Sequence, residues 1–323
     1  MASLKEIKDR IASVSGTLKI TSAMKMVASA KLHKAQQAIG NMLPYEKCLH
    51  GMLIDLMEVS PEGAYSLMEE RPARKVAVVA FASNSSLCGA FNANVIREAT
   101  AVVDEYRSAG LRDSDIVVYS VGRKMAEAMR KLGFQSPADF SKLSDSPSYE
   151  AASALAQELL DGFVSGRFDK IELVYNHYKS TSSQPTMRQT YLPLSLADAT
   201  ADLQAGKVTA SSVAEDASTS SGVSVDGNKD AGSSSAASAV TDLIIEPSPE
   251  DLIQTLLPKV VRLRIFTTLL DSSAAEHAAR TVAMQLATDN GNDLLQELTL
   301  EYNKGRQQKI TSEILDLVGG SLQ

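Results

Sequence analysis

Apolar side chains recur near the N-terminus with the period of a long helix. They fall three or four residues apart, and the pattern continues less strictly towards the middle of the segment: Leu4, Ile7, Ile11, Val14, Leu18, then Thr21, Met24, Val27 and Ala28. Such spacing forms the a/d seam of helices that pack in pairs. The pattern resumes after Pro44 and stops at Ser60–Gly63, which predicts a helix over 1–60. At about 80 Å this helix would exceed the width of a small domain, so it must pair with another segment.

The C-terminal end of the chain offers that partner. After Pro258 no proline occurs again, and apolar residues continue at helical spacing as far as Val318. Gly319 and Gly320 then supply a stop signal, so the pattern predicts a helix over 248–319. We expect the two terminal helices to form a long antiparallel coiled coil. Two helices that flank an ordinary bundle remain the alternative.

The middle of the chain alternates strand and helix patterns. Short apolar runs predict strands, with the last two forming a hairpin: 75–81, 115–121, 170–176 and 186–194. Helical patterns lie between them, over 92–109, 123–132 and 148–163. This alternation predicts a small doubly wound α/β domain over 70–194, so the fold class is a long helical coil with an α/β domain.

The segment 195–240 differs from the rest in composition. No aromatic residue occurs between Tyr191 and Phe266, and Ser, Ala, Gly and Asp dominate from Ser211 to Val240. Such a segment has too little apolar area to offset the entropy of ordering it, which predicts a disordered Ser/Ala-rich insertion. A tolerated linker and a regulatory segment both remain open.

Composition excludes several classes of protein. The 323 residues carry a net charge of −7, which argues against a general nucleic-acid binder. Two cysteines cannot build a disulfide framework. The longest apolar run, Val76–Ala82, is far short of the ~20 residues that cross a bilayer, and the first residues lack the apolar core of a signal peptide. We therefore expect neither a membrane-spanning nor a secreted protein.

The loop Ser85–Asn92 lies where a phosphate-binding loop would lie, between the first strand and a helix. It holds one glycine and no lysine, and lacks both common phosphate-loop spacings. A structural turn or a contact loop is favoured over a nucleotide site. Cys88 is open to two interpretations, a reactive thiol at the helix start or a small buried filler.

No active site is visible in the sequence. The four histidines, His33, His50, His177 and His277, never approach metal-ligand spacing with each other or with cysteine. No G-x-S-x-G elbow marks a nucleophilic serine, and the carboxylates are scattered. We expect no catalytic residue, no metal and no cofactor.

Charge is unevenly distributed along the chain. Seven basic residues stand against Glu6 and Asp9 between Met1 and Lys34, although the whole chain is acidic. A solvated helix face would explain this excess. A basic shaft that meets acidic loops of a partner would explain it too, and both interpretations stay open.

Longer motifs at both ends and in the first loop closely resemble those of the gamma subunits of F-type ATP synthases. They are Ile7–Val14, Lys19–Ala28, Leu87–Asn92, Ala278–Met284 and Tyr302–Ile314. The similarity covers essentially the whole chain outside 195–240. The resemblance implies that the coil is a rotor shaft inside a ring of alpha and beta subunits. It also implies that the α/β domain binds the epsilon subunit and the c-ring, and that the gamma chain supplies no catalytic group. The complex then holds the chain at the cytoplasmic face of the inner membrane as a peripheral protein.

The resemblance also assigns contact residues. Met24 and Lys25 stand where the N-terminal helix faces a beta-subunit loop, and Cys88 lies in the loop that faces an acidic lever of beta. Four positions match those that meet the beta catch loops and the N-terminal helix: Arg306, Gln307, Thr311 and Glu313. Four more would form the tip in an apolar bearing: Ile314, Leu315, Leu317 and Val318.

The chain departs from the family pattern at a few positions. Asn84-Ser85-Ser86 replaces an Asp-basic-Gly triplet, which leaves a charged contact with the beta lever open. Ala275 stands where serine is common, and Gly305 replaces the usual alanine. The insertion contains no cysteine, which predicts that it carries no thiol control.

Overall fold

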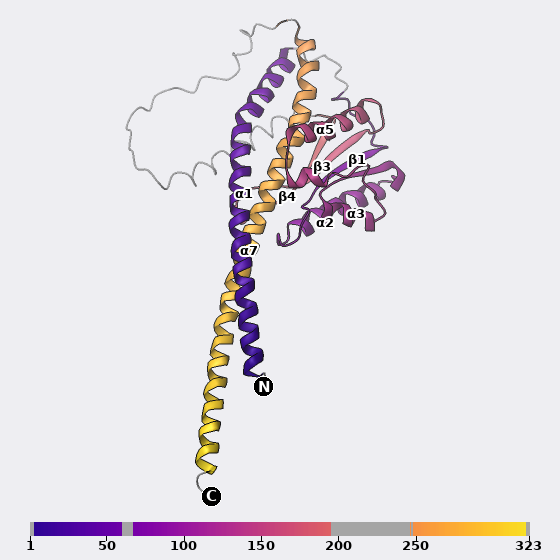
Figure 1. Ribbon diagram of the computed structural model, residues 1–323. Helices are drawn as coiled ribbons and strands as arrows, with labels where there is room; N and C mark the ends of the chain where they lie inside the picture. The colour runs from indigo at the N-terminus through magenta and orange to yellow at the C-terminus, as the bar shows by residue number, and fades with distance from the viewer. Residues whose placement is uncertain (1–2, 60–66, 195–245, 247, 321–323) are drawn as a thin grey trace, which may run out of the picture.

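Two long helices form the axis of the molecule. The computed structural model describes residues 3–59, 67–194, 246 and 248–320. Within them α1 (Leu4–Val59) and α7 (Pro249–Gly320) lie side by side and run in opposite directions, with both chain ends at the same end of the pair (Figure 1). Their 56 and 72 residues correspond to about 84 and 108 Å at 1.5 Å per residue. The predicted insertion over 195–240 lies outside the described residues.

The two helices keep a constant register over the part of the pair from Leu4 to Thr21. A Cβ placed on Gly305 would lie 3.1 Å from Leu4 Cδ2, and one placed on Gly291 would lie 2.6 Å from Leu18 Cδ2. The step of 14 residues from Leu4 to Leu18 is therefore matched by a step of 14 back along α7. Both leucines rest on positions without a side chain, which lets the helices approach closely.

Further contacts of the pair follow the same register. Thr288 donates to the Thr21 hydroxyl at 3.0 Å. Leu32 and Ala35 of α1 are buried with Ala274 and Ala278 of α7. The seam thus joins α1 and α7 along the whole stretch from Leu4 to Ala35.

One predicted seam residue is not in the seam. Val27 is 58% exposed, whereas its neighbour Ala28 is 2% exposed. A spacing of three or four residues admits either position, and the partner helix selects Ala28.

A four-stranded mixed sheet lies beside the helix pair. Its order is β2-β1-β3-β4, where β1 (Val76–Phe81) is parallel to β2 (Ile116–Val121) and to β3 (Lys170–Asn176). The last strand, β4 (Thr186–Leu192), is antiparallel to β3, so the predicted hairpin is confirmed. Every residue of β1 is buried, as expected for a central strand covered on both faces.

Helices cover both faces of this sheet. Alternate residues of a strand point to opposite faces. Val76, Val78 and Ala80 pack with α2 (Phe91–Ser108) and α3 (Arg123–Lys131). The other residues of β1 pack with α5 (Tyr149–Val164), and with α7. Two short elements that the sequence analysis did not predict, the 3-10 helix η1 (Asp113–Asp115) and α4 (Ser141–Asp145), complete the domain.

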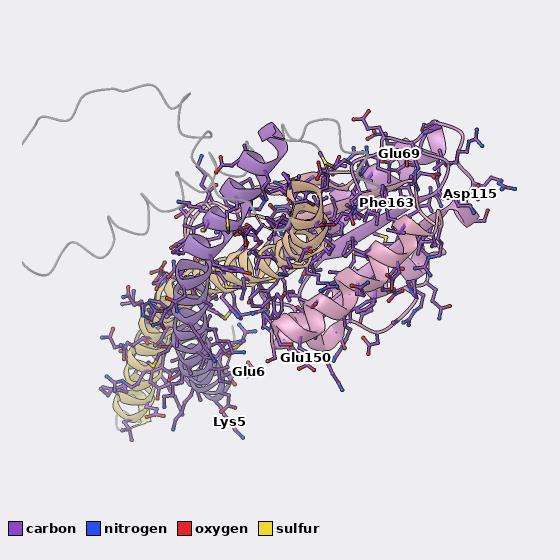
Figure 2. The ribbon with its side chains drawn as sticks, turned by 90° about the horizontal axis from the view of Figure 1, so that it is seen from above. Lys5, Glu6, Glu69, Asp115, Glu150 and Phe163 are labelled. Carbon is purple, nitrogen blue, oxygen red and sulfur yellow. The ribbon has the colours of Figure 1, made fainter. Side chains whose placement is uncertain are left out.

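The domain and the helix pair share one core. The buried cluster that contains Val79 and Phe81 also contains Leu53 of α1 and Val260 of α7. Seen from above, the domain stands to one side of the two helices, with Asp115 on its outer side (Figure 2). The thick part of the molecule is therefore at the end of the pair opposite the chain termini (Figure 1).

Candidate functional site

The described residues contain neither a cluster of metal-binding side chains nor a membrane span. No group of three or more His, Cys, Asp or Glu side chains among them is placed to hold a metal ion. In the same residues, no helix combines the length and the apolar character that a bilayer crossing requires. The features with functional potential are the surfaces of the long helices and the loop that follows β1.

The loop after β1 presents a strained tip. Leu87 has a φ of 68°, in the left-handed region that side chains other than glycine rarely adopt, and is 59% exposed. The base of the loop is held by Asn92, which accepts from the Ser83 N–H at 3.0 Å and donates to the Ser85 carbonyl at 3.2 Å. Residues held in such backbone regions cluster at binding sites. The loop therefore has the character of a contact loop.

Cys88 does not belong to the exposed part of this loop. Its side chain is 1% exposed and packs with Phe91 and Ala275. This agrees with the buried-filler interpretation and leaves no surface on Cys88 for a partner. We therefore transfer the expected partner contact from Cys88 to its exposed neighbours Ser86 and Leu87.

The usual ligand position of a doubly wound sheet is filled by α7. In such sheets ligands bind beyond the carboxyl ends of the strands, where the strand order reverses, here between β1 and β3. Ala275 and Ala279 of α7 pack against Cys88 and Phe91 at this point. Arg280 donates to the Ser85 hydroxyl at 2.9 Å. This packing argues against a nucleotide site in the loop.

Charged groups of α7 lie in the contact with the loop. Glu276 is 8% exposed and pairs with Arg280 at 2.7 Å. Burial raises the pKa of Glu276, although the Arg280 charge works in the opposite direction. Burial, with the charges of Arg280 and Lys31, lowers the pKa of His277 to about 4. His277 is therefore neutral at pH 7 in the folded chain.

A second set of contacts ties the end of β3 to both long helices. His177 Nδ1 lies 2.6 Å from Asp271 Oδ2, and the Tyr178 N–H donates to Asp271 Oδ1 at 2.8 Å. Gln36 of α1 donates to the Tyr178 hydroxyl at 2.9 Å. The hydrogen bond that the His177 ring donates to the Asp271 carboxylate raises the pKa of His177. The sequence analysis missed this link, because His177, Gln36 and Asp271 are far apart in the chain.

The predicted contact pair on α1, Met24 and Lys25, lies at the edge of the seam. Both side chains are half-buried. The Lys25 ammonium donates to the Gln285 side-chain oxygen on α7. Because the ammonium already donates a hydrogen bond within the chain, fewer of its N–H groups are available to a partner subunit.

The four predicted positions near the end of α7 are all exposed. They are Arg306, Gln307, Thr311 and Glu313. Because α1 begins at Leu4, opposite Gly305, α7 continues from there without α1 beside it (Figure 1). The resemblance implies that these four positions also pack on the N-terminal helix. In the structure they are instead exposed on a single helix.

The predicted tip is apolar and exposed where its side chains are described. Ile314, Leu315 and Leu317 are 55%, 65% and 75% exposed. The fourth predicted tip residue, Val318, lies outside the described side chains. A run of exposed apolar residues on one helix end marks a surface that another protein covers.

Comparison with known proteins decides the family. A family model described as ATP synthase matches residues 3–322. The "ATP synthase gamma chain" of Phocaeicola vulgatus is 49% identical over 322 residues, which cover 100% of both chains. The chain belongs to the ATP synthase gamma-chain family. A gamma chain of Flavobacterium johnsoniae is 38% identical and aligns with 99% of this chain and 98% of its own length.

Solved structures share the fold. A chain of the Euglena gracilis mitochondrial ATP synthase, solved with OSCP, F1 and c-ring, has a TM-score of 0.57 at 18% identity, and the match covers 99% of this chain and 93% of that one. A chain of the Tetrahymena thermophila central stalk and c-ring structure has a TM-score of 0.53 at 20% identity, with 83% and 99% covered. A gamma chain is a non-catalytic subunit, which agrees with the preference for a contact loop over a nucleotide site at Ser85–Asn92.

Proposed function

We propose that this chain is the rotor shaft of a proton-translocating F-type ATP synthase, which couples proton flow through the membrane c-ring to ATP synthesis or hydrolysis in the head of alpha and beta subunits. The observation that carries the proposal is the shape of the molecule. A long helix pair is anchored in a folded domain at one end and narrows to the single helix α7 at the other (Figure 1). A shaft needs a stiff axis, a firm anchor and a slender end.

The helix pair has the features of a coiled coil. The leucine and glycine contacts recur after 14 residues on both helices, which is two heptads. Two helices that keep one heptad register over many turns wind around each other. This supports an antiparallel coiled coil formed by segments 1–60 and 248–319, with the domain over 70–194 attached to it.

The slender end fits the head of the complex. Beyond Gly305 about 22 Å of α7 stand alone, first with polar residues and then with the apolar tip. We assign the polar positions Arg306, Gln307, Thr311 and Glu313 to contacts with beta-subunit loops, and the tip to an apolar bearing. On α1, Met24 and Lys25 are assigned to the same ring of subunits.

The thick end fits the membrane side. The solved neighbours are described as central stalk, c-ring and F1 assemblies, and we infer epsilon and c-ring subunits as partners of the α/β domain. The chain would then associate with the cytoplasmic face of the inner membrane through the complex. His177 and Tyr178 of the domain are hydrogen-bonded to Asp271 of α7, and Tyr178 also accepts from Gln36 of α1. A force on the domain therefore reaches both helices of the shaft directly.

The energies involved favour a distributed contact surface. Three protons that cross about 180 mV release roughly 12 kcal/mol. A single exposed ion pair contributes about 1 kcal/mol or less. A single rim contact of the shaft is therefore too weak to transmit this energy, and many contacts must share it. The seam between α1 and α7 must also stay intact while the shaft carries the torque.

Affinity purification tests the assignment. The tagged chain is isolated from membranes in mild detergent, and its partners are quantified by mass spectrometry, with an untagged strain as control. We expect about three alpha and three beta subunits for each tagged chain, together with ATPase activity. Recovery of the chain alone would refute the rotor assignment and favour a free-standing coiled-coil adaptor.

A matched pair of variants connects this result to the seam. Leu32→Asp places a carboxylate in the buried cluster with Ala274 and Ala278 and is expected to abolish the capture of alpha and beta. His33→Asp introduces the same charge at the next position, which is exposed, and is expected to retain the capture. Equal loss in both variants would contradict a role of the seam.

A further inference from the structure

An open cleft lies at the outer edge of the α/β domain, away from the helix pair. Its volume is about 610 Å³, and it lies between α3 and the segment 134–141 beside the end of β2. Sites for small molecules commonly have volumes of this size. Ser120 near the carboxyl end of β2 is part of the wall of the cleft. The cleft is separate from the position between β1 and β3 that α7 fills.

The cleft contains a buried hydroxyl that has no partner. Ser120, the last but one residue of β2, is 3% exposed and lines the cleft. Its backbone N–H donates to the Ser136 hydroxyl at 3.3 Å, but its own Oγ has no hydrogen-bond partner among the described residues. Buried polar atoms in folded proteins are normally hydrogen-bonded, so this hydroxyl would gain a partner if its side chain turned towards a ligand atom in the cleft.

Two guanidinium groups flank the cleft without an ion pair in the described part of the chain. Arg123 and Arg130 lie seven residues apart on α3, which places them on the same side of the helix about 10 Å apart. Neither makes a salt bridge, whereas Glu127 between them pairs with Lys124 at 3.1 Å. The second carboxylate of the cleft, Asp139, accepts from the Ser141 N–H at 2.9 Å. The Arg123 charge also acts on Asp139 and, after the Ser141 hydrogen bonds, helps to lower its pKa. Neither guanidinium group is held in an ion pair within the described residues, so both can bind a further anion.

We propose that this cleft binds a small anion with phosphate or carboxylate groups, held between Arg123 and Arg130 and hydrogen-bonded to the Ser120 hydroxyl. Guanidinium groups bind both kinds of anion through paired hydrogen bonds. The buried hydroxyl donates to an anionic oxygen, because an oxygen of this kind can only accept. The inference goes beyond the proposed rotor function and does not depend on it.

Calorimetric titration of the full chain tests the proposal. The probes are pyrophosphate and citrate, each in about 150 mM salt, so that phosphate and carboxylate ligands are distinguished. We expect saturable binding of at least one probe with a Kd of about 1 mM or lower. Arg123→Gln and Arg130→Gln should each weaken the binding about tenfold, and Ser120→Ala should weaken it several-fold.

A charge-matched control variant excludes general electrostatic attraction. Arg97 on α2 is exposed and contacts Asn94 at 3.3 Å, outside the cleft. Arg97→Gln should leave the binding unchanged. Absence of saturable binding for both probes up to about 10 mM, or equal weakening by Arg97→Gln, would overturn the proposal.

Hydrogen exchange on the intact complex supplies a second test. Pyrophosphate or citrate should increase the protection of segment 134–141 in the assembled complex. If this segment is fully protected before a probe is added, a neighbouring subunit covers the cleft. That result would also overturn the proposal.

Discussion

Replacement of Gly291 by alanine is expected to weaken the helix pair, although alanine is the better helix former. A Cβ at this position lies 2.6 Å from Cδ2 and 3.2 Å from Cγ of Leu18. Leu18 must then change rotamer or the helices must separate, and such overpacking costs typically 1–3 kcal/mol. The gain in helix propensity is about 1 kcal/mol. We expect the free energy of unfolding to fall by about 1 kcal/mol.

Gly40→Ala is the matched control for this variant. Gly40 also lies inside a long helix, but a Cβ there would meet nothing within 4 Å. Only the propensity gain and the smaller entropy of the unfolded chain remain, so the variant should be about 1 kcal/mol more stable than the parent chain. The two glycine variants are thus expected to change stability in opposite directions.

Urea unfolding of the full chain, followed by helical circular dichroism, measures both effects. Leu18→Ala in the Gly291→Ala background removes the clashing atoms, so the double variant should show a favourable coupling energy of about 1 kcal/mol. Stabilisation by Gly291→Ala to the same extent as by Gly40→Ala would refute the close contact between Leu18 and α7.

Four further outcomes are expected. In the assembled complex, Lys25→Ala should change the number of protons pumped per ATP little, because one half-buried polar contact contributes about 1 kcal/mol or less. Ile7→Ala, at a 4% exposed seam position, should destabilise the shaft by about 2–4 kcal/mol and uncouple the complex. An equal loss of coupling in Lys25→Ala and Ile7→Ala would contradict this order of effects. The pKa of His277 is about 4 when folded and ordinary when unfolded, so stability should fall as pH drops from 6.5 to 4, and His277→Gln should flatten this part of the urea-stability profile. The raised pKa of His177 has the opposite effect on stability: its stabilising contribution is complete below pH 6.5 and is lost as the pH rises through the folded value. Asp271→Asn should remove this loss from the urea-stability profile, and a profile that keeps it would contradict the assignment.

The long helices and the strands follow from local pattern. Their apolar residues recur at three and four positions, or in short continuous runs, and each pattern reports the surface that an element must bury. The β3–β4 hairpin could be predicted for this reason, since both strands are close in sequence. The choice between Val27 and Ala28 could not, because both fit the helical period and only α7 decides between them.

The candidate site was less accessible from sequence, because its geometry depends on distant segments. Gly291 and Gly305 look like weak points of one helix, yet each receives a leucine from the other. Cys88 lies in a motif of the contact loop, but Ala275, nearly two hundred positions later, buries it. The signal that could have directed attention to the loop tip is Leu87, an apolar residue next to two serines.

The way the domain is attached determines which part of the molecule can transmit rotation. Residues of α1, α7 and the sheet belong to one buried cluster, so turning the domain against the helices would expose that core to water. The hydrogen bonds of Asp271 with His177 and Tyr178 fix the same junction through polar contacts. At the other end, the apolar side chains of Leu315 and Leu317 are exposed and have no such attachment within the described chain, which suits the proposed apolar bearing. We therefore expect a torque applied to the domain to be carried by both helices through the seam, and to reach the surrounding subunits along the exposed flanks of the shaft rather than at the tip.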